Sequence, residues 1–186
     1  LAFEPRRDTF AVLGRNIHRN GLDARIRARN VGVSDQPGII HLQDPEAGTQ
    51  NLGSLALIDQ GEGYEVELIT LDMLELPELD LLKIDVEGME ANVISGARQT
   101  LRRCRPVVFA ECNSVSGAAA TLASTDGLGY RAFGAIYPAF NPDNINGCAD
   151  NFFGDNAECA LFLVPEERVD ILPLRDMRPI NTLEDV

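Results

Sequence analysis

Acidic and polar side chains follow several apolar segments of this sequence, at the points where buried strands are expected to end. The positions are Glu4, Ser34-Asp35, Asp85-Val86-Glu87 and Glu111. In an open parallel sheet, ligands bind in the crevice at the carboxyl ends of the strands, so these side chains would meet around a bound molecule. Asp and Ser after a strand also form turns and helix N-caps, and this simpler interpretation stands beside the functional one.

Carboxylates at such positions can bind a ligand or act as general bases. Glu4 can accept hydrogen bonds from both hydroxyls of a ribose, as a carboxylate at the end of a strand in a nucleotide-binding unit does. Asp85 and Glu87 can act as a general base toward a hydroxyl, and a carboxylate is favoured because His18 and His41 fall inside expected elements. Glu87 also suits the first turn of a helix.

Composition narrows the class of protein. The chain has 186 residues, of which 45% are hydrophobic, enough for one globular core. Its 16 Lys and Arg against 29 Asp and Glu give a net charge of −13, which would repel a nucleic acid. The longest apolar runs are far shorter than the roughly 20 residues that cross a bilayer, so neither nucleic acid nor membrane is expected as a partner.

The cysteines are few and widely spaced: Cys104, Cys112, Cys148 and Cys159. This spacing is a poor match to a zinc site or a disulfide framework. We predict buried or half-buried thiols in a reducing compartment, and hence a cytoplasmic protein. An alternative is that Cys148 and Cys159 approach each other across a loop.

Hydropathy and turn residues predict strands that alternate with helices. The expected strands cover residues 1–4, 25–33, 39–42, 64–71, 79–86, 106–111, 130–133 and 158–164, and the expected helices cover 8–20, 87–103 and 117–124. The alternation predicts an α/β fold with a mostly parallel sheet, and the strands at 39–42 and 64–71 predict an antiparallel excursion. We expect one domain over residues 1–164 and an extended arm over residues 165–186.

Several short blocks occur in a fixed order over residues 1–113. They are Leu1-Ala2-Phe3-Glu4-Pro5, Leu13 through Asn20-Gly21, Val31-Gly32-Val33-Ser34-Asp35, Thr70-Leu71-Asp72, Leu82-Lys83-Ile84-Asp85-Val86-Glu87-Gly88-Met89-Glu90, Arg105-Pro106 and Glu111. Together they resemble the FkbM-type methyltransferases, and the run that ends at Glu90 is the most specific block.

The resemblance implies a Rossmann-like class I methyltransferase sheet with flanking helices. It also implies S-adenosylmethionine as cofactor and a small hydroxylated acceptor, typically a sugar or a polyketide-like natural product. For the cofactor, it implies that Glu4 binds the ribose and that Ser34 and Asp35 lie near the adenine. It implies that Asp85, Val86 and Glu87 lie beside the reacting methyl group. It also implies that Asn51, Ser54 and Glu111 face the acceptor. Asn51 and Ser54 also suit plain turns.

A metal-assisted site is the alternative at the same strand ends. Asp85, Glu111 and Asn113 offer the hard oxygen ligands that Mg²⁺ prefers. The resemblance carries no metal with it, and we therefore predict a site without one.

The family's first strand and glycine-rich loop have no counterpart in these residues. In the implied strand order 3-2-1-4-5-7-6, the absent strand would lie between residues 1–4 and 79–86. We expect upstream residues, another segment or a second copy of the chain to pair there, because unsatisfied backbone groups on buried edges cost roughly 1–3 kcal/mol each. The competing hypothesis is a degenerate, non-catalytic domain that acts as an interaction or assembly module.

Overall fold

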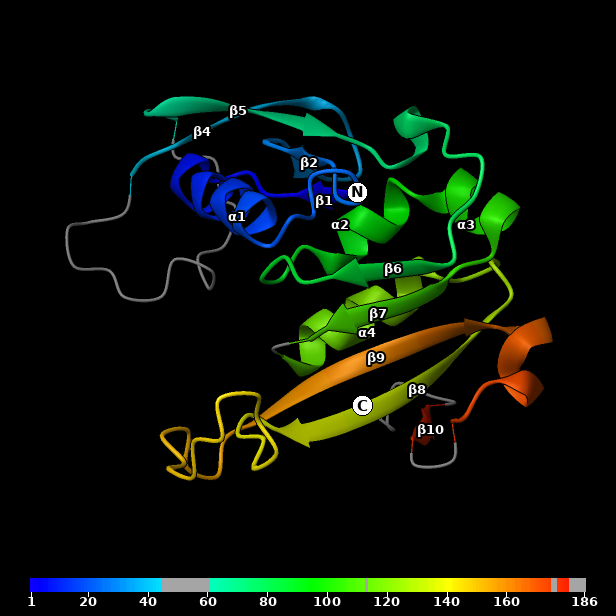
Figure 1. Cartoon of the computed structure of the whole chain (residues 1–186). Helices are drawn as coiled ribbons and strands as arrows, with labels where there is room; N and C mark the ends of the chain where they lie inside the picture. The colour runs from blue at the N-terminus through cyan, green and yellow to red at the C-terminus, as the bar shows by residue number, and fades with distance from the viewer. Residues whose placement is uncertain (45–60, 113, 175–176, 181–186) are drawn as a thin grey trace. The chain divides into compact units, whose positions relative to one another are not determined.

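The structure is a computed structural model, and it describes residues 1–44, 61–112, 114–174 and 177–180 (Figure 1). The chain is a mixed α/β protein in two compact units. The first comprises Leu1–Leu76 and Asn92–Thr100, and the second comprises Pro77–Ala91 and Leu101–Val186.

The first unit contains two small sheets. Its elements are β1 (Ala2–Phe3), α1 (Arg7–Arg19), β2 (Ala28–Arg29), β3 (Gly32–Val33), β4 (Gly38–Leu42), β5 (Tyr64–Ile69) and the 3₁₀ helix η1 (Asp72–Leu74). β1 pairs with β2 in parallel, and β5 pairs in parallel with β3 and antiparallel with β4. The predicted antiparallel excursion is therefore confirmed.

The strand predicted over residues 25–33 is two strands in different sheets. β2 pairs with β1, whereas β3 pairs with β5. Between them, the Asn30 side-chain amide donates hydrogen bonds to the carbonyls of Glu4 (2.7 Å) and Pro5 (2.9 Å). These two bonds tie the chain to the residues after β1 at the point where it changes sheets.

The single helix predicted over residues 87–103 is also divided, into α2 (Glu90–Ser95) and α3 (Arg98–Cys104). At the break, the carbonyl of Gly96 accepts a hydrogen bond from Asp72 N at 3.0 Å. The Asp72 carboxylate accepts from Gln99 N (2.9 Å) and Thr100 N (2.7 Å), so it satisfies the free N–H groups at the start of α3. The helical spacing could not reveal this cap, because Asp72 is distant in sequence.

We expect Gly96→Ala to destabilise the protein. An added Cβ would lie 2.0 Å from the backbone oxygen of Ser34 and 3.1 Å from the Cα of Asp35, so backbone atoms would have to move. Such overpacking costs roughly 1–3 kcal/mol. Gly14→Ala is the matched control, because a Cβ there has nothing within 4 Å and lies inside α1. The control should stabilise by up to about 1 kcal/mol. Urea denaturation measures both, and equal stability of the two variants would contradict the prediction.

The second unit is built on a five-stranded sheet. Its elements are β6 (Leu81–Ile84), β7 (Val107–Glu111), α4 (Val115–Ser124), β8 (Tyr130–Pro138), β9 (Ala157–Pro165), the 3₁₀ helix η2 (Glu166–Ile171) and β10 (Arg178–Ile180), and the strand order is β10-β8-β9-β7-β6. The run β6-β7-β9-β8 agrees with the 4-5-7-6 half of the expected order. The prediction of a mostly parallel sheet is wrong here, because β9 is antiparallel to both of its neighbours.

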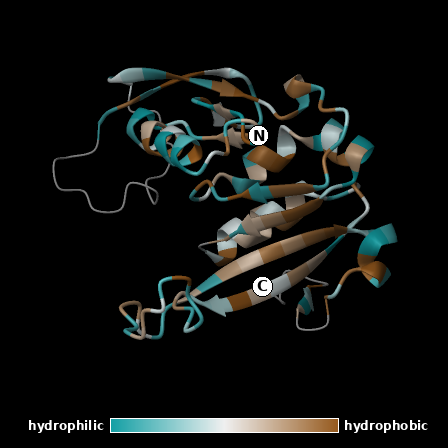
Figure 2. Cartoon of the chain, viewed as in Figure 1, coloured by the Kyte–Doolittle hydropathy of each residue, from teal (hydrophilic) through white to brown (hydrophobic). Residues whose placement is uncertain are grey.

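The core of the second unit lies along β7 and β9. Val108, Ala110, Leu163 and Val164 are at most 1% exposed. The rings of Phe109 and Phe162 pack edge to face with centroids 4.9 Å apart. Figure 2 shows the hydrophobic colouring along both strands. Both strands are apolar runs of the sequence, as predicted for buried strands.

Within residues 165–186, for which an extended arm was predicted, the described residues contain η2 and β10. β10 pairs antiparallel with β8, and η2 follows β9 directly. Arg105 forms a bidentate ion pair with Glu167 of η2. Its Nε and one terminal nitrogen each lie 2.8 Å from a Glu167 carboxylate oxygen. The same guanidinium donates to the carbonyls of Leu128 and Gly129. The Arg105-Pro106 block of the sequence therefore serves the structure of this unit.

The Arg105–Glu167 pair should make stability depend on acidic pH. The hydrogen bond from Arg105 lowers the pKa of Glu167 from 4.5 to about 2. A carboxyl group with a lowered pKa stabilises the fold above its ordinary pKa, and this contribution is lost as the pH falls from 4.5 toward 2. We expect Glu167→Gln to remove part of the loss, measured as urea midpoints at about pH 6 and about pH 3. Glu166→Gln is the control, and identical pH dependence in both variants would contradict the assignment.

Two thiols are more exposed than predicted. Cys112 is buried and Cys104 is half-buried, but Cys148 and Cys159 are exposed, and all four are free. The prediction of buried or half-buried thiols is therefore wrong for Cys148 and Cys159. Cys159 lies on β9 opposite Cys112, because Cys112 N donates to the Cys159 carbonyl at 3.0 Å.

Candidate active site

Acidic side chains gather around a lysine at the carboxyl ends of β6 and β7. Lys83 Nζ lies 2.7 Å from Asp85 Oδ2 and 3.9 Å from Glu111 Oε2. β6 and β7 pair in parallel, with Ile84 opposite Ala110, so the residues that follow each strand emerge at the same edge. The structure thus brings Asp85 and Glu111 together, as the sequence analysis expected.

Glu111 is the most shielded member of this acidic group. Its side chain is 18% exposed, against 43% for Asp85. Burial raises the pKa of Glu111 above its ordinary value, and the nearby charges of Asp85 and Glu158 raise it further, while Lys83 lowers it. A carboxylate whose protonation is favoured in this way is a better proton acceptor than an ordinary one.

A tight turn after β6 presents Glu87. Glu87 and Gly88 have φ values of 52° and 95°, and a non-glycine residue with positive φ is uncommon. Glu90 supports the turn: it is 2% exposed, and its Oε1 accepts a hydrogen bond from Gly88 N at 3.0 Å. Val86 is half-buried between the strand and the turn. Glu90 belongs to the motif at residues 82–90, but its type and spacing alone did not predict this positioning role.

Two further residues of the acidic group were missed. Tyr137 and Glu158 occupy opposite positions on β8 and β9. The pKa of Tyr137 is raised, first by burial and then by the charges of Glu111 and Glu158. Only the hairpin register brings them beside Glu111, and a Tyr and a Glu separated by a long loop carry no sequence signal of this proximity.

Glu4, the predicted ribose ligand, follows β1 in the first unit. Its carboxylate is half-buried, and Oε1 accepts a hydrogen bond from Arg6 N at 2.8 Å. Burial raises the pKa of Glu4, and the Arg6 backbone bond opposes the rise. Because a carboxylate offers about four acceptor sites, capacity remains for two hydroxyl groups. The Glu4 carboxylate therefore retains acceptor capacity for further hydrogen bonds.

Ser34 and Asp35 form a second polar group of the first unit, together with a residue that the sequence analysis missed. Ser34 Oγ and Asn92 Nδ2 each donate to Asp35 Oδ1 at 3.0 Å. The bond from Asn92 is the main cause that lowers the pKa of Asp35. The donors Ser34 and Asn92 therefore favour the ionised form of the Asp35 carboxylate.

Some expectations fall outside the described residues. Asn51, Ser54 and Asn113 lie in the segments that are not described. Within the described ranges, no group of three or more His, Cys, Asp or Glu residues is arranged to hold a metal ion. His18 lies in α1 and His41 in β4. In the same ranges, no helix is long and apolar enough to cross a membrane.

Comparison with known proteins places the chain in a family. A solved structure of methyltransferase FkbM from Methylobacillus flagellatus KT is similar at 17% identity and a TM-score of 0.47, over 86% of this chain and 35% of that chain. The chain thus spans about a third of the length of that relative. No curated protein matches. The family model described as "Methyltransferase FkbM domain" matches residues 1–136, well over half of the sequence. The protein therefore belongs to the FkbM methyltransferase domain family.

Proposed function

We propose that the protein is an S-adenosylmethionine-dependent O-methyltransferase acting on a small hydroxylated acceptor, of the sugar or polyketide type. The observation that carries this proposal is the acidic group at the ends of β6 and β7, where Lys83 bridges Asp85 and the shielded Glu111. An alcohol must lose its proton when it is methylated, and this group offers carboxylates for that step.

The cofactor supplies an electrophilic methyl group on a sulfonium sulfur when bound, and the protein chiefly supplies alignment. In this proposal, Glu4 binds the ribose hydroxyls, while Ser34 and Asp35 lie toward the adenine. Asp85 and Val86 line the methionine end. The half-buried carboxylate of Glu4 and the ordered Asp35 support these roles.

In this proposal, the acidic residues of the chain have two roles at the acceptor, to accept its proton and to bind it. Asp85 or Glu87 receives the proton from the acceptor hydroxyl, and Glu111 binds the acceptor, together with Asn51 and Ser54. Lys83 lies within 4 Å of both Asp85 and Glu111, and its positive charge offsets the repulsion between the two carboxylates. The raised pKa of Glu111 also makes it a third candidate for the base.

A further part of the proposal concerns the open edges of the sheets. β6 is an edge strand of its five-stranded sheet, and β1 has β2 as its partner in the part of the chain that the structure describes. We propose that another segment or a second copy of the chain pairs with these edges in the active protein.

A methyl-transfer assay tests the function. The complete protein is incubated with labelled S-adenosylmethionine and a panel of sugars and hydroxylated polyketides, and S-adenosylhomocysteine release is measured. Acceptor-dependent release supports the proposal. Calorimetry with S-adenosylhomocysteine distinguishes a methyltransferase from a non-catalytic interaction module. A methyltransferase should bind this product, and absence of binding would favour the non-catalytic module.

A further inference from the structure

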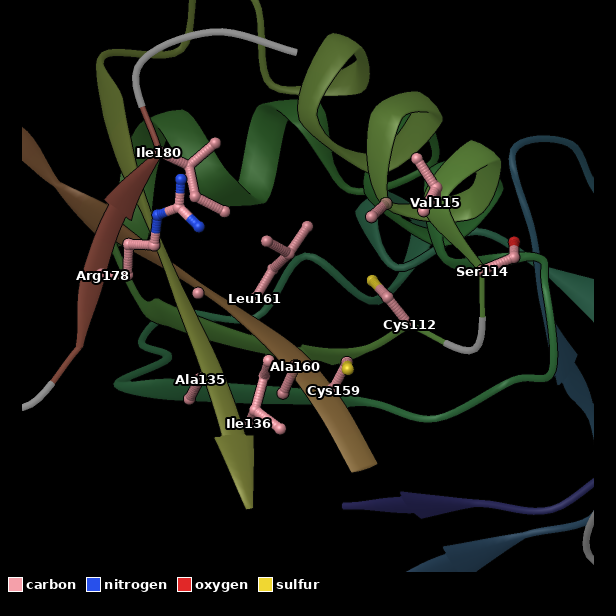
Figure 3. Close-up of a pocket in the computed structure, with 12 residues that line it drawn as sticks. Cys112, Ser114, Val115, Ala135, Ile136, Cys159, Ala160, Leu161, Arg178 and Ile180 are labelled. Carbon is pink, nitrogen blue, oxygen red and sulfur yellow. The ribbon is translucent and has the colours of Figure 1, made fainter. Parts of the chain in front are cut away.

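Two cysteines face the same cavity from neighbouring strands. A cavity of about 350 Å³ in the second unit is lined by residues of β8, β9, β10 and the start of α4, and both Cys112 and Cys159 are among them (Figure 3). The acidic group described above uses neither thiol. The cavity wall is mostly apolar, with Ala135, Ile136 and Leu161 in view.

The ladder between β7 and β9 sets the two thiols opposite each other. Glu111 pairs with Ala160, and the next bond, from Cys112 N to the Cys159 carbonyl, is 3.0 Å long. Directly opposed residues project from the same face of a sheet. A hydrogen-bonded antiparallel pair has Cα atoms roughly 5.5 Å apart, within the roughly 4.4–6.8 Å that disulfides span. The backbone can therefore accept a cross-strand disulfide with little movement.

The two thiols differ in access and reactivity. Cys159 is exposed, whereas Cys112 is 6% exposed. Burial is the main cause that raises the pKa of Cys112 to about 11, so this sulfur is almost entirely a thiol near neutral pH. An external oxidant therefore meets Cys159 first, and Cys112 is suited to the second, intramolecular step.

We propose that Cys112 and Cys159 form a thiol–disulfide exchange site for low-molecular-weight disulfides of the glutathione type. The Cys159 thiolate attacks one sulfur of the reagent, which forms a mixed disulfide and releases one thiolate. Cys112 then loses its proton and attacks the Cys159 sulfur, which closes the Cys112–Cys159 bond and releases the second thiol. Two protein thiols are oxidised, and one reagent disulfide is reduced to two thiols.

The position of the two cysteines predicts that their oxidation affects the candidate active site. This prediction rests on the proposed function. Glu111 directly precedes Cys112, and Glu158 directly precedes Cys159. Oxidation would lock the ends of β7 and β9 at the residues that follow both acids. We expect a lower rate of methyl transfer in the oxidised protein, restored by a reductant.

Peptide mapping tests the site directly. The full-length protein is treated with oxidised glutathione, its remaining thiols are blocked, and it is digested without reductant by Glu-C protease and trypsin. Cleavage after Glu111, Arg131 and Glu158 separates residues 112–131, 132–158 and 159–166, so each peptide carries one cysteine. We expect residues 112–131 linked to residues 159–166, with the loss of two hydrogens.

Matched variants decide the outcome. Cys159→Ser changes an exposed residue and should abolish the link, and Cys112→Ala should leave glutathione attached to Cys159. Cys148→Ser, in the exposed loop before β9, should leave the link intact. A link between Cys148 and Cys159, or glutathione retained on Cys159 of the wild-type protein, would overturn the site. A link with unchanged methyl transfer would overturn only the regulatory consequence, and absence of transfer in the reduced protein would count against the proposed function.

Discussion

Replacing Asp85 by Asn, or Glu87 by Gln, should lower the rate of methyl transfer by a factor on the order of 10²–10⁴ if the replaced residue is the general base. Both changes keep the shape of the side chain and remove its charge. Asp85 follows β6 and lies against Lys83, and Glu87 occupies the strained turn that Glu90 supports. Single-turnover rates with saturating cofactor and acceptor measure the effect.

Glu111→Gln belongs in the same experiment, because the structure makes Glu111 a third candidate. Glu62→Gln, at an exposed position of the first unit, is the matched control and should keep the wild-type rate. Thermal melts must accompany each assay, since loss of rate through unfolding would not identify a catalytic residue. If all three acid variants keep wild-type turnover, the catalytic role of the group is wrong.

The pH dependence of the rate distinguishes the candidate bases. A base must be ionised, so the rate rises with pH through the pKa of that residue. Because burial and neighbouring acids raise the pKa of Glu111, its use as the base would move the rise above the range of an ordinary glutamate. Glu111→Gln would then remove the rise altogether.

Glu4→Ala should weaken cofactor binding by about 1.5–3 kcal/mol, which is roughly a tenfold to 150-fold increase in Kd. The loss arises because the carboxylate would no longer accept charge-assisted hydrogen bonds from the ribose hydroxyls. Calorimetric titration with S-adenosylhomocysteine measures the change. Binding should also weaken at acidic pH, and the raised pKa of Glu4 places this loss above the ordinary glutamate range.

The control for Glu4 has to separate ligand binding from folding. Glu4 Oε1 also accepts the Arg6 N–H, so the Ala variant loses a bond of the turn after β1. Glu4→Gln keeps an oxygen that can accept that bond while it removes the charge, and it should show an intermediate Kd with an unchanged melting temperature. An unchanged Kd in both variants would refute the ribose assignment.

The sequence by itself determined the local elements and the residue types at their ends. Apolar patterning predicted α1, β4, β5, β6, β7 and β9 close to their observed bounds, because that patterning lies within each segment and needs no distant residue to be read. Asp85 and Glu111 were expected at one edge because parallel strands end together, and β6 and β7 do pair in parallel. The ordered blocks over residues 1–113, of which the motif that ends at Glu90 is the most specific, indicated the family that the comparison gave.

Only the tertiary structure decided how distant segments meet. The break between α2 and α3 depends on Asp72 and on the close approach of Gly96 to Ser34, and neither contact leaves a local signal. The reversed direction of β9 brings Glu158 and Tyr137 to Glu111, and it sets Cys159 opposite Cys112. Hydropathy indicates whether a strand is buried, but not which strand pairs with it or in which direction. The reason is that the backbone hydrogen bonds between paired strands are the same for every residue type.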